Sequence, residues 1–319
     1  MTSVYITIDT EYSAAFAAHG REEAFARSIR CDTPGGEVGI GYQMDVFDRH
    51  GIKAVFFVDP MPALLWGVEA IADVVGPIVS RGHDVQLHLH TEWLALAGPA
   101  NPLDGRTGTN IKDFAFDDQC ELIAYAAGVL QWAGAPFPVA FRAGNYGADD
   151  DTLRALAELG LRYDTSHCPG IAGSLCDISL GPEDRQPMMH EGVVEVPVGC
   201  IGTRGEGLRH AQVTALGSGE MLAAINHAVQ GGVDSFTIVS HSFELLSRDR
   251  LRANRIVKHR FERFCQGLAR LDGAQSATFA RRPPAVQGRQ YTPVLPPGFL
   301  RTGQRLSEQL VANALYGAR

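Results

Sequence analysis

Two histidines stand two residues apart inside an apolar run, in the segment GHDVQLHLHTEW at residues 82–93. Side chains at positions i and i+2 of an extended strand point to the same face, so His88 and His90 share a face. Imidazole is a preferred zinc ligand, and this spacing offers two of them to one ion. The alternative is a pair of core histidines that are satisfied by the protein. Glu92, four residues after His88, is a further candidate ligand.

Two carboxylates follow the first apolar segment, in the sequence ITIDTEY. Asp9 and Glu11 are two residues apart, so in an extended chain both enter one pocket. Close carboxylates repel each other unless a cation or a shared proton separates them. This pair therefore indicates either a metal site or the start of a helix, with Asp9 or Thr10 as its N-cap and Glu11 in its first turn.

An arginine and a glycine turn end another apolar run, in the sequence FRAGNYG. A buried arginine needs a carboxylate or an anionic ligand, so Arg142 is expected either to orient Asp9 or to form a structural salt bridge. Gly144 and Asn145 permit unusual backbone angles that turn amides into a pocket. We therefore expect Asn145 and Tyr146 to contact the substrate or its oxyanion.

A last histidine follows a long β-prone run, in the sequence TIVSHSFELL. His241 suits a general acid that titrates near neutrality, and the alternative is a core histidine. Together these residue types predict metal-assisted hydrolysis of a carbonyl substrate. The metal would polarise water and carbonyl, Asp9 would take the proton of the water, and His241 would protonate the leaving group.

The elements that position these residues alternate along the chain. Strands are expected at 4–8, 52–58, 83–90, 138–144, 161–166, 193–198 and 235–242, and helices at 41–51, 62–82, 117–134, 149–160, 218–232 and 257–271. This order predicts a parallel sheet with crossover helices, in either an open doubly wound sheet or a barrel. Polar residues at the carboxyl ends of the strands favour the barrel.

Composition excludes some classes of protein. The chain has 319 residues and a net charge of −8, which argues against a nucleic-acid partner. Its six cysteines are widely spaced and contain no CxxC pair, so we expect reduced thiols. No apolar run reaches the length of a membrane span, and the N-terminus does not read as a secretion signal. The expected location is the cytoplasm.

The order of these motifs resembles that of the polysaccharide deacetylase family, carbohydrate esterase family 4, also called the NodB-homology domain. The resemblance covers residues 4–272 and implies a deformed (β/α) barrel that removes acetyl groups from sugars with a divalent metal, often zinc. The segment IDTE implies Asp9 as base and Glu11 as metal ligand, SRGHDVQLH implies His88 as ligand, FRAGNYG implies Arg142, and IVSHS implies His241. The segment VVEVPV is similar to a strand of intracellular branches linked to envelope-polysaccharide or lipopolysaccharide biosynthesis.

The chain departs from the family pattern at several positions. The usual second metal histidine falls at Glu92, so we expect His90 to replace it. Glu11 stands in place of an aspartate, and the arginine motif has Gly-Asn in place of its proline. Asp164, in RYDTS, is the expected partner of His241.

The predicted organisation is a barrel over 1–272, of about seven parallel strands, and a Pro-rich extension with a terminal helix over 273–319. The predicted function is de-N-acetylation of a sugar or of a glycolipid or polysaccharide precursor. The alternatives are a metal-independent, allantoinase-like hydrolase of cyclic amides and an inactive carbohydrate-binding homologue. The sequence leaves a homo-oligomer open.

Overall fold

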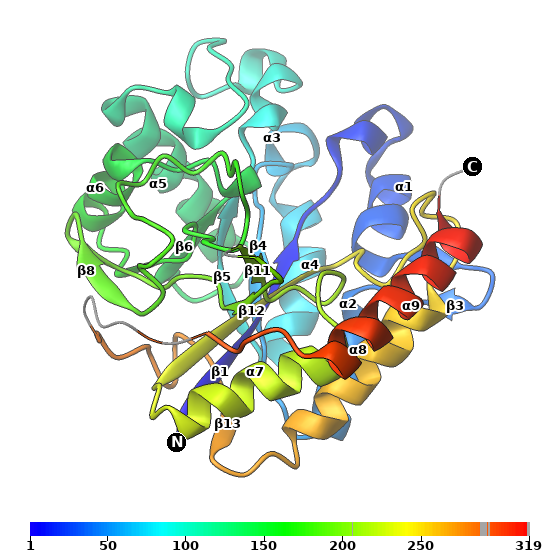
Figure 1. Ribbon diagram of the computed structural model, residues 1–319. Coiled ribbons are helices and arrows are strands. Elements are labelled where there is room, and N and C mark those ends of the chain that lie inside the picture. Colours follow the sequence, from blue (N-terminus) through cyan, green and yellow to red (C-terminus); the bar gives the residue numbers. More distant parts are fainter. Residues whose placement is uncertain (206, 288–291, 293, 318–319) are drawn as a thin grey trace.

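A curved, mostly parallel sheet forms the centre of the molecule (Figure 1). The computed structural model describes residues 1–205, 207–287, 292 and 294–317. The sheet curls into a half-barrel surrounded by helices, which confirms the deformed (β/α) barrel. Its strands are, in spatial order, β12 (Ser235–His241), β1 (Thr2–Thr10), β4 (Val55–Val58), β5 (Asp84–Leu89), β6 (Ala140–Ala143), β7 (Tyr163–Asp164), β9 (Val193–Glu195) and β8 (Met188–His190). Only the β8–β9 pair in this order is antiparallel.

The register of the parallel strands brings the candidate site residues to the same edge of the sheet. Asp9 is the register partner of His241 across β1 and β12. His88 is the partner of Arg142 across β5 and β6. All nine residues of β1 and all six of β5 are buried, because helices and loops cover both faces of the sheet.

The six expected helices are present, with one correction. They are α2 (Ile40–Arg49), α4 (Val68–Ser80), α5 (Phe116–Trp132), α6 (Asp150–Glu158), α7 (Ser218–Gln230) and α8 (Arg255–Leu268). The prediction of one helix over 62–82 is wrong, because a separate short helix, α3 (Ala63–Trp66), precedes α4. Gly67 separates the two with a φ of 76°, a conformation that ends a helix and that glycine adopts without strain.

Short elements connect the longer helices and strands. They are α1 (Arg21–Phe25), the hairpin β2 (Asp32–Thr33) and β3 (Gly36–Glu37), the hairpin β10 (Cys200–Gly202) and β11 (Leu208–His210), a π-turn at Ala26–Arg30 and 3₁₀ turns at Ala14–His19, Thr91–Ala95, Gly98–Ala100, Ile111–Asp113 and Gly144–Tyr146. All six cysteines are free, as expected. Within the described part of the chain, no helix is long and apolar enough to cross a membrane.

The segment after residue 272 packs on the barrel. Strand β13 (Ala274–Ala277) pairs in parallel with β1. The expected terminal helix is α9 (Phe299–Tyr316), which lies alongside α7 and α8 (Figure 1). Ion pairs join α9 to both helices, from Arg305 to Glu220 at 3.1 Å and from Glu308 to Arg260 at 2.8 Å. The division of the chain at residue 272 stays a prediction.

Candidate active site

One carboxylate and two imidazoles converge at the carboxyl ends of β1 and β5. Oε2 of Glu11 lies 2.6 Å from Nε2 of His90 and 3.2 Å from Nε2 of His88. Nδ1 of His88 lies 2.7 Å from the carbonyl oxygen of Arg142. Since a carbonyl only accepts, Nδ1 of His88 carries a proton, and Nε2 is the nitrogen that faces Glu11 and that would bind a metal.

The charges of this cluster stabilise each other. Burial opposes ionisation of Glu11, but the neighbouring His90 and His88 hold the pKa of its carboxyl well below the usual range. Burial likewise opposes protonation of His90, but Glu11 raises its pKa to about 10. In the protein without an ion, a proton on His90 therefore balances Glu11, and a dication would take the place of that proton.

The donor set fits a divalent transition metal. Two imidazoles and one carboxylate are the ligand types of catalytic zinc sites, which keep a further position for water or substrate. The candidate ligand atoms of Glu11, His88 and His90 all lie within 4.8 Å of one another. Glu92 is exposed on the turn after β5 and does not join this group.

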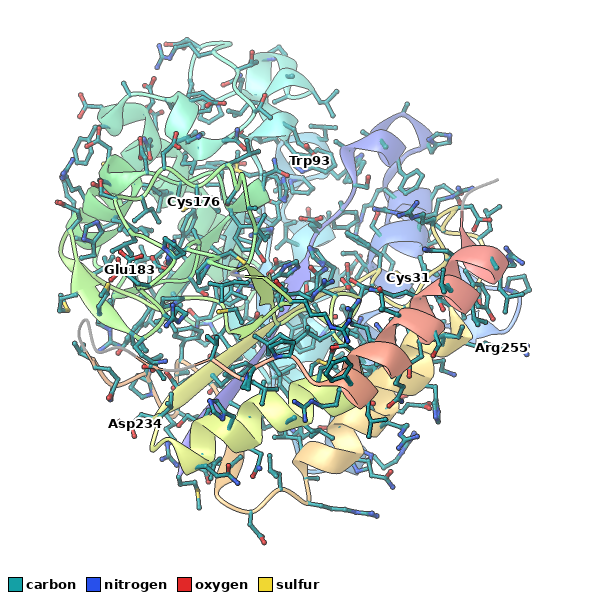
Figure 2. All side chains as sticks on the ribbon, in the orientation of Figure 1. Cys31, Trp93, Cys176, Glu183, Asp234 and Arg255 are labelled. Atoms are coloured by element: carbon teal, nitrogen blue, oxygen red, sulfur yellow. The ribbon has the colours of Figure 1, made fainter. Side chains whose placement is uncertain are left out.

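A buried aspartate that the sequence did not reveal, Asp59, is hydrogen-bonded to the backbone of His90. Asp59 directly follows β4 and is 1 % exposed. Its carboxylate accepts hydrogen bonds from Nε1 of Trp93 at 3.0 Å, from the amide of Met61 at 3.1 Å and from the amide of His90 at 3.4 Å. Burial raises its pKa to about 6, against the opposing effect of His90 and His88. Figure 2 labels Trp93 beside the α3 region. The sequence feature that could have identified Asp59 is its position directly after a run of buried β-forming residues, which is also the position of Asp9 in the sequence.

Arg142 holds Asp9 in the interior of the half-barrel. The arginine is fully buried, and its Nη1 donates to Oδ1 of Asp9 at 2.6 Å and to Oγ1 of Thr7 at 2.9 Å. Its Nε donates to the carbonyl of Thr165 at 3.2 Å, and its guanidinium lies 4.6 Å from the centre of the Phe57 ring. This is the arrangement expected for an arginine that orients Asp9. Because Arg142 bonds only to Oδ1, Oδ2 of Asp9 is free to accept a proton.

His241 connects Asp9 to a second buried carboxylate. Its Nε2 lies 3.9 Å from Oδ2 of Asp9, and its Nδ1 lies 2.8 Å from Oε2 of Glu244. Glu244 is fixed by Nε2 of Gln212 at 3.0 Å and by the amide of Thr214 at 3.1 Å. Burial lowers the pKa of His241, but Glu244, with smaller contributions from Asp9 and Glu11, outweighs burial and raises it to about 9. The imidazole is therefore protonated at neutral pH.

Glu244 stands in the position that the sequence analysis gave to Asp164. Asp164 accepts hydrogen bonds from the amide and hydroxyl of Ser166, at 2.7 and 2.8 Å, and it interacts with Glu195. In the described chain no hydrogen bond or ion pair joins Asp164 to His241, whose Nδ1 is bonded to Glu244, and four strands separate β7 from the strand of His241, so the expected pairing is wrong. Burial raises the pKa of both acidic groups of the Asp164–Glu195 pair.

The turn after β6 has left-handed backbone at two residues. Asn145 has a φ of 56° and Tyr146 a φ of 58°. Asn145 is exposed, whereas Tyr146 is half-buried and packs beside Cys168. Gly144 precedes them, and a Cβ there would lie 2.7 Å from Nδ1 of His90. The turn thus packs directly against the cluster, and the expected oxyanion role of Asn145 and Tyr146 stays a prediction.

Comparison with known proteins gives similarity in structure only. No protein-family model and no curated protein matches the chain. A crystal structure from Mycobacterium smegmatis, of a protein assigned as a polysaccharide deacetylase, is 15% identical with a TM-score of 0.57, covering 92% of each chain. A family 4 carbohydrate esterase from Streptomyces lividans in complex with acetate is 13% identical with a TM-score of 0.46, covering 93% of this chain and 98% of that one. The chain therefore shares the fold of the Mycobacterium smegmatis structure.

Proposed function

We propose that this chain is a metal-dependent hydrolase that removes an acetyl group from a sugar, by de-N-acetylation. The observation that carries the proposal is the position of the Glu11–His88–His90 cluster beside Asp9 and His241, at one edge of the sheet. The similarity in fold to a structure assigned as a polysaccharide deacetylase supports the choice of reaction. A divalent metal, with zinc as the first choice, would be held by Glu11, His88 and His90.

The proposed roles of Asp9 and His241 follow from their charges and from the atoms that their neighbours leave free. When bound, the metal supplies Lewis-acid polarisation of the acetyl carbonyl and of a water molecule. Asp9 takes the proton of that water through Oδ2, because Arg142 occupies Oδ1. His241 delivers a proton to the leaving nitrogen, because Glu244 keeps its imidazole protonated at neutral pH.

The test measures metal and acetate together. The purified protein is expected to contain about one divalent metal ion per chain, by elemental analysis, and to release acetate from acetylated sugars. His88→Ala should lose both, whereas Glu92→Ala, which removes an exposed carboxylate outside the cluster, should keep both. Acetate release that persists in His88→Ala and in chelator would overturn the metal-dependent mechanism.

The substrate class and location are proposed from the sequence alone. A sugar-lipid or polysaccharide precursor in the cytoplasm is the proposed setting. Cleavage of a cyclic imide in the presence of chelator would instead favour the metal-independent hydrolase. Sugar binding without acetate release would favour an inactive homologue.

A further inference from the structure

A cavity of about 650 Å³ opens beside His241, and Glu11, His88 and His90 are not among its described lining residues. Its walls come from the loop after β12, from α8 and from the C-terminal helix α9. Four charged residues among its described lining are Glu244, Arg248, Arg250 and Arg260. Glu244 is paired with His241, and Arg260 is paired with Glu308 and with the carbonyl oxygens of Val213 and Thr214.

Arg250 differs from Arg260 because its charge is not neutralised. Within the described chain, no carboxylate oxygen lies within 4.0 Å of its guanidinium, and its buried Nη1 has no hydrogen-bond partner. The side chain is half-buried, and burial lowers its pKa while Cys31 and Glu11 raise it. A buried donor without a partner is costly, so a ligand that accepts a hydrogen bond from Nη1 would stabilise the site.

Aromatic rings hold the guanidinium next to the reacting groups. Arg250 lies 4.1 Å from the centre of the Phe243 ring and 5.7 Å from that of Phe16. Phe243 in turn stacks on His241, with ring centres 5.2 Å apart and planes at 30°. A group bound by Arg250 would therefore share the cavity with a group protonated by His241.

The backbone fixes this position at a cost. Arg250 has a φ of 57°, a left-handed conformation that costs a non-glycine residue about 1 kcal/mol or more. Its amide donates to the carbonyl of Ser247 at 2.9 Å, and the amide of Ser247 donates to the carbonyl of Arg252 at 2.8 Å. The amide of Arg248 donates to the carbonyl of Tyr316 at 3.0 Å, which ties the loop to α9. The turn is thus held from two sides with Arg250 at its inner face.

We propose that Arg250 is a specificity residue that binds an oxyanion of the substrate, a carboxylate or a phosphate on the sugar whose acetyl group reacts beside His241. The identity of the reacting group rests on the proposed function, whereas the anion site does not. Arginine suits both anions because its planar guanidinium makes two parallel hydrogen bonds to either.

The test compares three sugars that carry no acetyl group, so that binding is measured without turnover. Glucose, glucuronate and glucose 6-phosphate are titrated by calorimetry into the metal-loaded protein. At least one anionic sugar is expected to bind about tenfold more tightly than glucose, as one additional charge-assisted contact implies. A preference for glucuronate alone assigns a carboxylate, and a preference for glucose 6-phosphate alone assigns a phosphate.

Variants separate Arg250 from other sources of attraction. Arg250→Gln should bring all three sugars to within about twofold, and Arg250→Lys should keep part of the preference because it keeps the charge. Arg255→Gln is the control for net charge, since Arg255 is exposed, does not line the cavity, and lies farther out than Cys31 in Figure 2.

Two results would overturn the assignment. One is equal binding of all three sugars by the unmodified protein, and the other is a preference that survives in Arg250→Gln, because the anion would then be held elsewhere, for example by the metal. A preference that depends on Arg250 in a protein that releases no acetate would leave the anion site standing and remove the proposed deacetylation. Acetate release by a protein that binds all three sugars equally would leave the proposed deacetylation standing and remove the anion site.

Discussion

Replacing Glu244 with glutamine removes the charge that keeps His241 protonated. The carboxylate lies 2.8 Å from Nδ1 of the imidazole and is itself buried. Glutamine has nearly the same shape and keeps a carbonyl oxygen as acceptor, so the change acts mainly on electrostatics. His241 stays buried in the variant, and burial alone lowers its pKa.

The size of the effect follows from the two pKa values. The pKa of His241 is raised to about 9. In the variant, Asp9 and Glu11 still raise the pKa of His241 and burial still lowers it, so we expect a return to about the ordinary imidazole value of 6.5, a drop of about 2.5 units or roughly 3.4 kcal/mol. At pH 8 the protonated fraction would fall from about 90% to about 3%, roughly 30-fold. The rate of a step that needs protonated His241 falls as pH rises through this pKa, so the alkaline limb of the variant should move to lower pH.

Two measurements check this shift. The titration of His241 is followed directly by NMR of the imidazole ε1 proton, assigned as the signal missing in His241→Gln. The alkaline limb of acetate release is measured in parallel. A bound dication would lower the pKa of His241 in both proteins, so the difference between them is the test. Glu92→Gln, which removes an exposed carboxylate, should leave the midpoint unchanged. An unshifted midpoint in Glu244→Gln would refute the reasoning.

Three further changes test the site. Arg142→Met leaves Asp9 buried without its partner, so it should lower the free energy of unfolding by about 3–5 kcal/mol. Urea titration measures this loss, and a loss below about 1 kcal/mol would contradict a tight Arg142–Asp9 pair. Gly144→Ala places a Cβ 2.7 Å from Nδ1 of His90 and should weaken metal binding by tenfold or more in competition with a chelating dye. Gly76→Ala, with open space around its Cβ, should keep the affinity of the unmodified protein. Removal of the metal by chelator should lower the melting temperature, and readdition should restore it, because an ion bound only by the folded chain stabilises it.

Much of the site could be predicted from the sequence because its residues end strands. Asp9, His88, Arg142 and His241 each follow or end a run of buried β-forming residues. Parallel strands of one sheet bring their carboxyl ends to one edge, so side chains far apart in sequence meet there. The spacing of His88 and His90 also predicted that both imidazoles face the same way, as the contacts of Glu11 with both show.

The partners of these residues depended on the order of strands in space. Asp164 ends a strand as His241 does, but four strands separate them, and periodicity does not encode that order. Glu244 is only three residues beyond His241, on a turn, and its carboxylate is held by hydrogen bonds from Gln212 and Thr214. The periodicity of strands in the sequence does not tell how close a turn residue such as Glu244 comes to side chains of another segment, such as that of Gln212.

The sequence by itself determined the alternation of strands and helices, the edge at which polar side chains gather and the residue types of the Glu11–His88–His90 cluster. Only the tertiary structure decided which carboxylate faces His241, that Asp59 accepts a hydrogen bond from the amide of His90, and that Nη1 of Arg250 is buried without a hydrogen-bond partner. The physical reason is that local propensity and periodicity act over a few residues. Pairing and desolvation of charges depend instead on which distant segments pack together, and packing is a property of the whole fold.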